Sequence, residues 1–436
     1  MKQELTLLLK QNSIQYLLLL SVLLTSVSLF NGWQNISHIE AQIRHAQLEE
    51  HNRHSQQLNE FNHHGEIDAG EVGYYVFHHV YQHPSEWSFI ALGNRLVTPY
   101  VQRIRLLGLQ SQMYDGESHH PEYVMLGAFD YAFWLVFFLP LLSIAFTHGL
   151  KADEYQAGRW TFLASMVAQP ANFWAKRLFI RWLLVLFTFL SPLVVVSILN
   201  ALSWQSLIRV VSVTVLYSFF WMVICGFVSL RKQAQNASAN AMVLASIWLL
   251  ICVVLPNLSQ RWLHQRHPVE DGSQIALQHR QLVHSAWDLP KEATLTPFYK
   301  LYPQLQHTPP VTGRFHWKWY YAFQHMADVN LAQKVAEREQ HLTMRDQASA
   351  TLSYLLPSLW AQRQLEEVAQ SNVMHLLNHR QKMNAFHTQL RHALYPYFFE
   401  DKPMSTEAFN SLPKFDHESS KIQPTQHEKL HLNIIK

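Results

Sequence analysis

Apolar residues are concentrated in five stretches that are nearly free of charge, and the segments between them are polar. Each stretch has close to or more than the roughly 20 residues that a helix needs to cross about 30 Å of hydrocarbon. Because a spanning segment must satisfy its own backbone hydrogen bonds, the pattern predicts five transmembrane helices. They cover residues 13–31, 125–147, 178–200, 207–230 and 239–258. Pro140, Pro192 and Pro256 are expected to kink these helices or to mark their ends.

Lysine and arginine residues near the ends of these stretches indicate the orientation of the chain. Threading five helices places all of them on one side: Lys2, Lys10, Lys151, Arg159, Lys176, Arg177, Arg231 and Lys232. The short opposite loop at 203–206 carries no positive charge, whereas the loop at 231–238 lies on the basic side. By the positive-inside rule the basic side is the cytoplasm. We therefore expect a cytoplasmic N-terminus and two long extracytoplasmic segments, 32–124 and 259–436.

The first stretch has a second interpretation, since a basic start followed by an apolar run is also typical of a cleaved signal peptide. Ser26 and Ser28 offer a weak small-residue cleavage site, but the apolar run continues past it to Phe30. We therefore favour a first span that is retained.

The extracytoplasmic segments show helical patterns of apolar residues. The first helix is expected to continue well beyond the membrane. The residues that carry this spacing are Ile36, Ile39, Ile43 and Ala46. Six prolines between 268 and 310 favour loops and short elements at the start of the second segment. From about Tyr320 to Phe399 the pattern is helical, with Pro357 dividing it into two helices, and from about Asp401 the chain is polar and is expected to be weakly ordered.

These patterns predict an all-α polytopic membrane protein with about five transmembrane helices and two mostly helical extracytoplasmic domains. Several of the 14 tryptophans lie where an apolar stretch meets polar sequence, as interfacial anchors do. The net charge of +3 gives no sign of a nucleic-acid footprint. Both cysteines, Cys225 and Cys252, lie inside apolar stretches, so no disulfide framework holds the polar segments.

The cytoplasmic segment 148–177 is short, charged at its start and amphipathic in its middle. On physical grounds alone, a basic interfacial helix is favoured over a docking element. The segment also resembles the core of type-2 ABC transporter permeases, which carry an acidic pair, a glycine–threonine step, a leucine-rich turn and Gln-Pro before a basic residue. The matching residues are Asp153, Glu154, Gly158, Thr161, Leu163, Gln169, Pro170 and Lys176. Arg159 and Trp160 separate the glycine from the threonine, which departs from the pattern.

The resemblance extends along the chain to a branch with large extracytoplasmic insertions, within a wider family named for multicopper enzyme maturation. Similar stretches are Phe129-Asp130-Tyr131, Leu139-Pro140-Leu141-Leu142, Leu356-Pro357-Ser358-Leu359 and Leu412-Pro413-Lys414-Phe415. The family implies a permease homodimer or heterodimer above two ATP-binding subunits, which hold ATP and Mg²⁺. It also implies that residues 153–170 form the coupling helix, and that residues 1–12 form an amphipathic helix on the cytoplasmic surface of a bacterial inner membrane.

The family normally has six helices, and its last helix returns to the cytoplasm. Residues 416–436 are too few and too charged to span a membrane. We therefore expect either a five-helix variant or a truncated chain, and favour truncation.

The sequence agrees with a separate ATPase subunit. It contains no Gly-x-x-x-x-Gly-Lys-Ser/Thr loop, and none of its 13 glycines precedes a lysine. We find no nucleophile elbow or dinucleotide loop either. The chain is therefore not expected to be an enzyme or to hold a cofactor of its own.

Three charged residues fall near the ends of the predicted spans: Asp130, Arg181 and Arg209. A charge within a membrane is a functional candidate by default. All three lie close enough to an interface for their side chains to reach polar surroundings, so a structural role is favoured.

Histidine is abundant, with 27 residues, and all but His148 lie in the extracytoplasmic segments. His51 and His54, and likewise His375 and His379, are spaced to share a helix face, as two ligands of Zn²⁺ or Cu²⁺ do. No cysteine or His-Glu-x-x-His motif accompanies these weak candidates, so we expect no metal site. The imidazoles should nevertheless make these domains sensitive to mild acidity.

The resemblance and the residues together favour the transmembrane subunit of an ABC exporter, with lipid as its other partner. The main alternative is a membrane-anchored scaffold or signalling protein whose outer helical domains bind an envelope partner. A third is a membrane-bound metal-binding protein. Delivery of a metal or cofactor is conceivable only by analogy with the name of the wider family.

Overall fold

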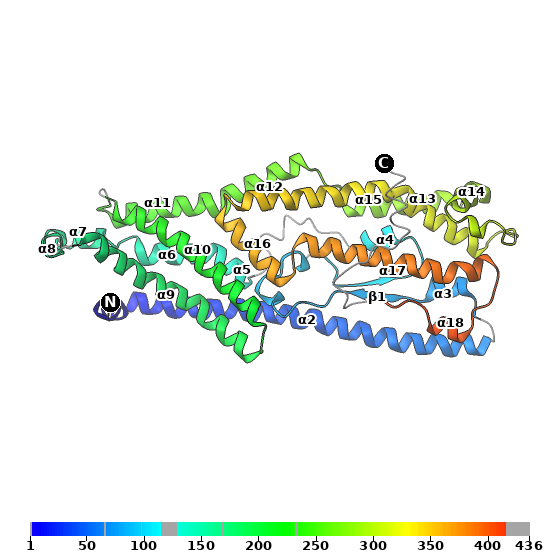
Figure 1. The fold of residues 1–436 in the computed structure, drawn as a ribbon, viewed down its shortest axis with the longest axis horizontal. Coiled ribbons are helices and arrows are strands. Elements are labelled where there is room, and N and C mark those ends of the chain that lie inside the picture. The colour runs from blue at the N-terminus through cyan, green and yellow to red at the C-terminus, as the bar shows by residue number, and fades with distance from the viewer. Residues whose placement is uncertain are drawn as a thin grey trace.

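A computed structural model describes most of the chain and shows an elongated, almost entirely helical molecule (Figure 1). Apolar spanning helices occupy one end, and a helical domain occupies the other. The residues described are 2–64, 67–96, 98–114, 129–167, 169–231 and 234–415.

Five helices in the described residues are long and apolar enough to cross a membrane, as predicted. The first is the start of α2 (Asn12–His64), and the second joins α5 (Tyr131–Phe133), η4 (Trp134–Phe138) and α6 (Leu139–Thr147). The third and fourth are α9 (Pro170–Leu199) and α10 (Trp204–Leu230). The fifth joins α11 (Ala237–Leu249), η5 (Leu250–Val254) and α12 (Leu255–Arg266). The chain is therefore an all-α polytopic membrane protein.

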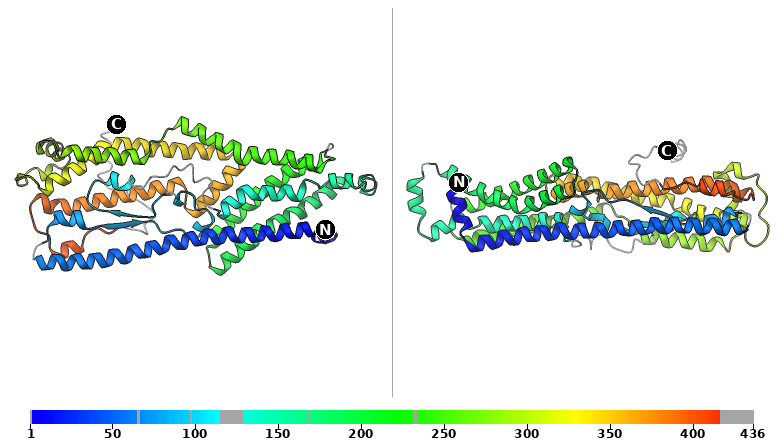
Figure 2. Two further views of the ribbon diagram at one scale, coloured as in Figure 1. Left: turned by 180° about the vertical axis from the view of Figure 1, so that it is seen from behind. Right: turned by 90° about the horizontal axis from the view of Figure 1, so that it is seen from below.

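Helix α2 is one continuous helix of 53 residues that runs along the spanning helices and continues along the other end of the molecule (Figure 2). At 1.5 Å per residue it is about 80 Å long. The predicted extension beyond the membrane is confirmed, because the residues that suggested it are all buried: Ile36, Ile39, Ile43 and Ala46.

The two segments beyond the membrane share one hydrophobic core, and we call the resulting body the distal domain. The first segment supplies α3 (Ala69–Tyr75), β1 (His78–Tyr81), β2 (Val101–Ile104) and α4 (Leu109–Tyr114). The second supplies α13 (Gly272–Ala286), α14 (Lys291–Leu301), α15 (Trp317–Ser353), α16 (Pro357–Ala369), α17 (Val373–Phe399) and α18 (Thr406–Asn410). The strands pair antiparallel, with His78 opposite Ile104 and Tyr81 opposite Val101. The core mixes aliphatic and aromatic residues; the rings of Phe298 and Phe399, for example, stack with centroids 5.0 Å apart.

The spanning helices and the distal domain are joined by a second core. It contains Leu135 and Phe189 of the spans, Phe89 of the short 3-10 helix η1 (Ser88–Ile90), and Ala361 and Leu365 of α16. The boundary between the membrane part and the distal domain is therefore packed.

The helical region after Trp317 contains three helices where the sequence predicted two. Pro357 does begin a helix, with Leu356 as its N-cap. A second break follows, because Gln370 adopts a left-handed conformation with φ of 55° and ends α16. The Asn372 side chain then accepts a hydrogen bond from the backbone N–H of His375 at 3.1 Å and caps α17.

The expectation of weak order from Asp401 is wrong as far as Phe415. Met404, Phe409, Leu412 and Phe415 are buried in the core of the distal domain. In the sequence these four apolar residues are spread among polar ones and show little periodicity, so the pattern did not predict their burial. The tail at 416–436, and with it the expectation of a missing last helix, lies outside the described residues.

Candidate functional site

The segment that resembles a coupling helix forms two short helices at the end of the molecule farthest from the distal domain (Figure 1). They are α7 (Ala152–Gln156) and α8 (Trp160–Met166). Gly158 lies between them with φ of 70°, a left-handed conformation that glycine adopts without strain. The glycine of the motif therefore makes the turn from α7 to α8.

Glu154 is buried at the base of this segment and pairs with two arginines. Its carboxylate accepts from Arg159 Nε at 2.7 Å and from Arg177 Nη1 of α9 at 3.0 Å. Arg177 Nε also donates to Glu4 at 2.9 Å. Glu4 belongs to α1 (Lys2–Leu9), the predicted amphipathic helix. Glu154 therefore ties α7 to α9 and, through Arg177, to the N-terminal helix.

Two further hydrogen bonds attach the start of the segment to the spanning helices. Lys151 Nζ donates to the carbonyl of Arg231, directly after α10, at 2.9 Å. Asn240 Nδ2 of α11 donates to the carbonyl of His148 at 3.1 Å. Movement of this base would consequently be transmitted to α9, α10 and α11.

Helix α8 itself has no buried residue. The side chains of Phe162 and Met166, one turn apart, are 65% and 68% exposed. Of the eight residues that resemble the family motif, Leu163 is half-buried and Glu154 is buried, and the others are exposed: Asp153, Gly158, Thr161, Gln169, Pro170 and Lys176. We call Thr161, Phe162 and Met166 the α8 surface. The sequence motif did not mark Phe162 and Met166, which lie between its positions.

The three charged residues near the span ends have different surroundings. The carboxylate of Asp130 caps α5 by accepting from the N–H of Phe133 at 2.9 Å, and it also accepts from the N–H of Leu92 at 2.9 Å. Arg181 donates to the carbonyl of Phe146. Arg209 is exposed on α10. Asp130 and Arg181 therefore hold neighbouring segments together, as a structural role requires.

Two spans contain a single π-helical turn, each ending two residues before a proline: η4 before Pro140 and η5 before Pro256. In a regular helix, residue 140 would donate to the carbonyl of Val136, but proline has no N–H. That carbonyl accepts instead from Tyr217 Oη of α10 at 2.8 Å and lies 3.7 Å from Cys252 Sγ of η5. The two π-helical turns are therefore in contact, joined by Tyr217.

A buried polar cluster lies in the distal domain, around Asp328 of α15. Its carboxylate accepts from the N–H groups of Leu109 and Gln110 at 2.8 and 3.0 Å and pairs with Arg391 of α17. The His279 Nε2 atom of α13 lies 3.1 Å away. Burial raises the pKa of Asp328, but the contacts with His279 and Arg391 outweigh burial and hold that pKa below its usual range. The cluster thus joins α4, α13, α15 and α17.

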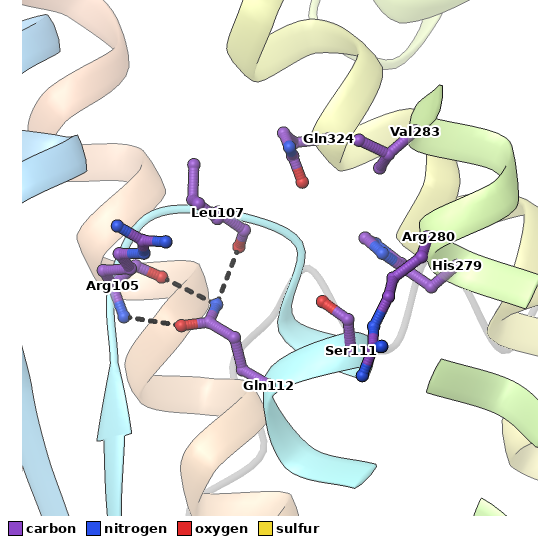
Figure 3. A pocket seen from close by; sticks show the side chains of 8 residues that line it. All are labelled: Arg105, Leu107, Ser111, Gln112, His279, Arg280, Val283 and Gln324. Carbon is purple, nitrogen blue, oxygen red and sulfur yellow. Dashed lines mark hydrogen bonds between the residues drawn. The ribbon is translucent and has the colours of Figure 1, made fainter. Parts of the chain in front are cut away.

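A cavity of about 260 Å³ lies beside this cluster (Figure 3). Gln112 forms one wall: its Oε1 accepts from the N–H of Arg105 at 2.9 Å, and its Nε2 donates to the carbonyl of Arg105 at 3.0 Å. Arg280 and Ser111 lie on the other side. A second cavity, of about 480 Å³, is lined by Asp68, Phe315, Trp317, Phe398 and Asp401, among others, and we call it the tip cavity.

Three of the four histidines proposed as weak metal candidates make other contacts. His54 stacks on Phe409 with centroids 4.7 Å apart, and His375 Nδ1 lies 2.7 Å from the Asn372 amide oxygen. His379 packs edge-to-face against Phe415, and His51 is exposed. Within the described ranges, no three His, Cys, Asp or Glu side chains are grouped as a metal ion would require.

Comparison with known proteins concerns the distal domain. Residues 273–418 match the profile of a domain of unknown function, DUF3526. No curated protein and no solved structure matches the chain. The matched region runs from α13 through α18 and does not include the α8 surface, so the case for a function rests on geometry and on the family resemblance.

Proposed function

We propose that this chain is the transmembrane permease subunit of an ABC-type exporter, and that the α8 surface docks on a separate ATP-binding subunit. The proposal rests on a contrast between the two parts of segment 148–177, its base and helix α8. Its base is fixed to α1, α9, α10 and α11, while α8 presents exposed apolar side chains away from them. A partner that pushes on α8 would thereby move several spans at once.

The orientation follows from the charges around this segment. Lys151, Arg159, Lys176 and Arg177 belong to it, so the positive-inside rule puts the α8 surface and the N-terminus in the cytoplasm. The distal domain would then lie outside the cytoplasm, as in a bacterial inner membrane. ATP and Mg²⁺ would be held by the partner, and a permease dimer would complete the exporter.

The proposal is tested by purifying the tagged chain from native membranes and identifying the bound proteins by mass spectrometry. The informative variant is Phe162→Ala with Met166→Ala, because both side chains are exposed and their loss should leave the fold intact. A matched control is Leu277→Ala with Leu289→Ala, two exposed apolar residues of the distal domain. We expect the wild type and the control to retain an ATP-binding subunit, and the α8 variant to lose at least 10-fold of it, which corresponds to about 1.4 kcal/mol.

Glu154→Ala is less suitable for this test, since it would leave Arg177 without one of its partners inside the protein. Loss of the ATPase subunit in that variant would not separate a damaged base from a damaged docking surface. Absence of any ATP-binding subunit from the wild-type sample would contradict the permease function.

The tip cavity favours a second function, a membrane-anchored scaffold. Phe315, Asp68 and Asp401 of its lining are exposed at the surface of the distal domain, where an envelope partner would reach them. Recovery of envelope proteins alone, lost on Phe315→Ala, would support this alternative.

A further inference from the structure

The turn between α15 and α16 exposes two large apolar side chains. Tyr354 is 85% and Leu355 is 78% exposed. They lie within residues 347–362, a run of 16 positions without Asp, Glu, Lys or Arg. We call this run the α15–α16 turn. Exposed turns in water are usually rich in polar residues, so an uncharged one with two exposed apolar side chains indicates an apolar environment.

The turn contacts the fifth span within its apolar part. Ser358 Oγ donates to the carbonyl of Ile251 in η5 at 2.8 Å. Ile251 lies seven residues before Leu258, where the apolar stretch ends, which is about 10 Å along a helix. Figure 1 shows α15 ending beside this span, with α16 continuing across α10. The turn therefore reaches the depth of the apolar span.

The backbone of the turn satisfies the condition that hydrocarbon imposes on buried N–H groups. The N–H of Tyr354 donates to Thr351 at 3.3 Å, and those of Leu355 and Leu356 donate to Leu352 at 3.0 and 3.1 Å. Pro357 has no N–H. These donors therefore need no water.

The nearest charged residues on either side of the turn are paired with each other. Arg363 of α16 donates to both carboxylate oxygens of Asp346 of α15, at 2.7 and 3.2 Å. This bidentate pair bridges the two helices where the uncharged run begins and ends. Trp360, three residues before Arg363, is half-buried, which suits an indole at a membrane interface.

We propose that the α15–α16 turn dips into the bilayer leaflet on the side of the distal domain, with Tyr354 and Leu355 in contact with lipid acyl chains. The Asp346–Arg363 pair then lies at the polar boundary. The distal domain is thus anchored in lipid at a point separate from the five spans. The inference does not depend on the permease function.

The test uses the full chain in phosphatidylcholine vesicles, with Leu355→Cys labelled by an environment-sensitive fluorophore. Quenching by nitroxide-labelled phosphatidylcholine is compared with quenching by aqueous iodide. Phe187→Cys on the exposed face of α9 is the lipid-facing reference, and Leu277→Cys on α13 is the water-facing reference. The wild-type chain gives the labelling background, since Cys225 and Cys252 are both buried. Tyr354→Cys provides an independent second position.

We expect the labels at 354 and 355 to be quenched by the nitroxide lipid at least half as strongly as the label at 187, and to resist iodide. Iodide quenching equal to that at 277 would overturn the proposal, because it would place the turn in water. Protection from both quenchers would overturn it as well, since the turn would then be covered by protein, for instance by a second copy of the chain.

Discussion

Glu154 belongs to a network of charged side chains that includes residues distant in sequence. Arg177 and Glu4 lie far from it along the chain, yet the three charges form one network at 2.9 to 3.0 Å. The family resemblance marked this residue as part of a docking segment, and docking stays a prediction. The burial of Glu154 could not be predicted, because no local pattern encodes a pairing between α1, α7 and α9.

His387 gives a prediction about acid. It is fully buried in α17, with Nε2 3.1 Å from the carbonyl of Arg105, and Arg391 and Asp328 are its charged neighbours. Burial lowers its pKa to about 3. The unfolded chain takes up this proton near pH 6.5 and the folded chain does not, so stability is lost as the pH falls below about 6.5. At pH 5 the loss from this one group is roughly 2 kcal/mol.

The prediction is checked by measuring the unfolding free energy of the full chain in micelles at pH 7 and pH 5. His387→Gln should reduce the difference between the two values by about 2 kcal/mol. The exposed His284→Gln is the control and should leave the difference unchanged. An unchanged difference in both variants would show that His387 is protonated in the folded state. Asp328 does not interfere, because its lowered pKa keeps it ionised at pH 5.

At the scale of single helices, the sequence predicted irregularities at prolines but did not predict the π-helical turns. Pro140 and Pro256 were expected to kink helices or mark ends, and each does follow an irregular turn. Pro192, in contrast, lies inside the continuous helix α9. The difference lies in the neighbours: the carbonyl of Val136 finds donors in Tyr217 and Cys252, which belong to other helices. Packing partners of this kind cannot be read from a local sequence.

Tyr217→Phe tests how much the contact between the π-helical turns contributes. The change removes the hydroxyl that donates to Val136 and leaves the ring in place. We expect a loss of about 1 kcal/mol, typical of a hydrogen bond between membrane helices, measured as a lower Tm in micelles. Tyr16→Phe, at an exposed position of α2, is the matched control and should leave the Tm unchanged. Equal Tm values for both variants and the wild type would show that water or lipid replaces the bond without cost.

At the scale of the whole molecule, the apolar pattern was sufficient to predict the spans and the extension of α2. It was not sufficient to predict that residues before and after the last four spans in the sequence, such as Ile104 and Phe386, would share one core. This core joins segments separated by more than a hundred residues and four spans. The tip cavity and the Asp328 cluster arise only from that union, so neither could be inferred from single segments.

The core shared by the spans and the distal domain predicts that both unfold together. We expect one transition, with tryptophan fluorescence and circular dichroism giving the same midpoint on heating. Ile43→Ala in α2 should lower the stability of the whole by about 2–5 kcal/mol, because the side chain is fully buried in that core. Leu48→Ala, exposed on the same helix, should change it little. Two separate transitions would show that the parts are independent.

The uninterrupted course of α2 has a mechanical consequence. Its last 33 residues extend roughly 50 Å past the first predicted span. A rigid rod of this length converts an inclination of about 10° at the bilayer into a sweep of about 9 Å at its far end. Because the rod is continuous with a span at one end and lies against the distal domain at the other, it acts as a lever: small rotations among the membrane helices reach the remote end of the protein as displacements the size of a side chain or more.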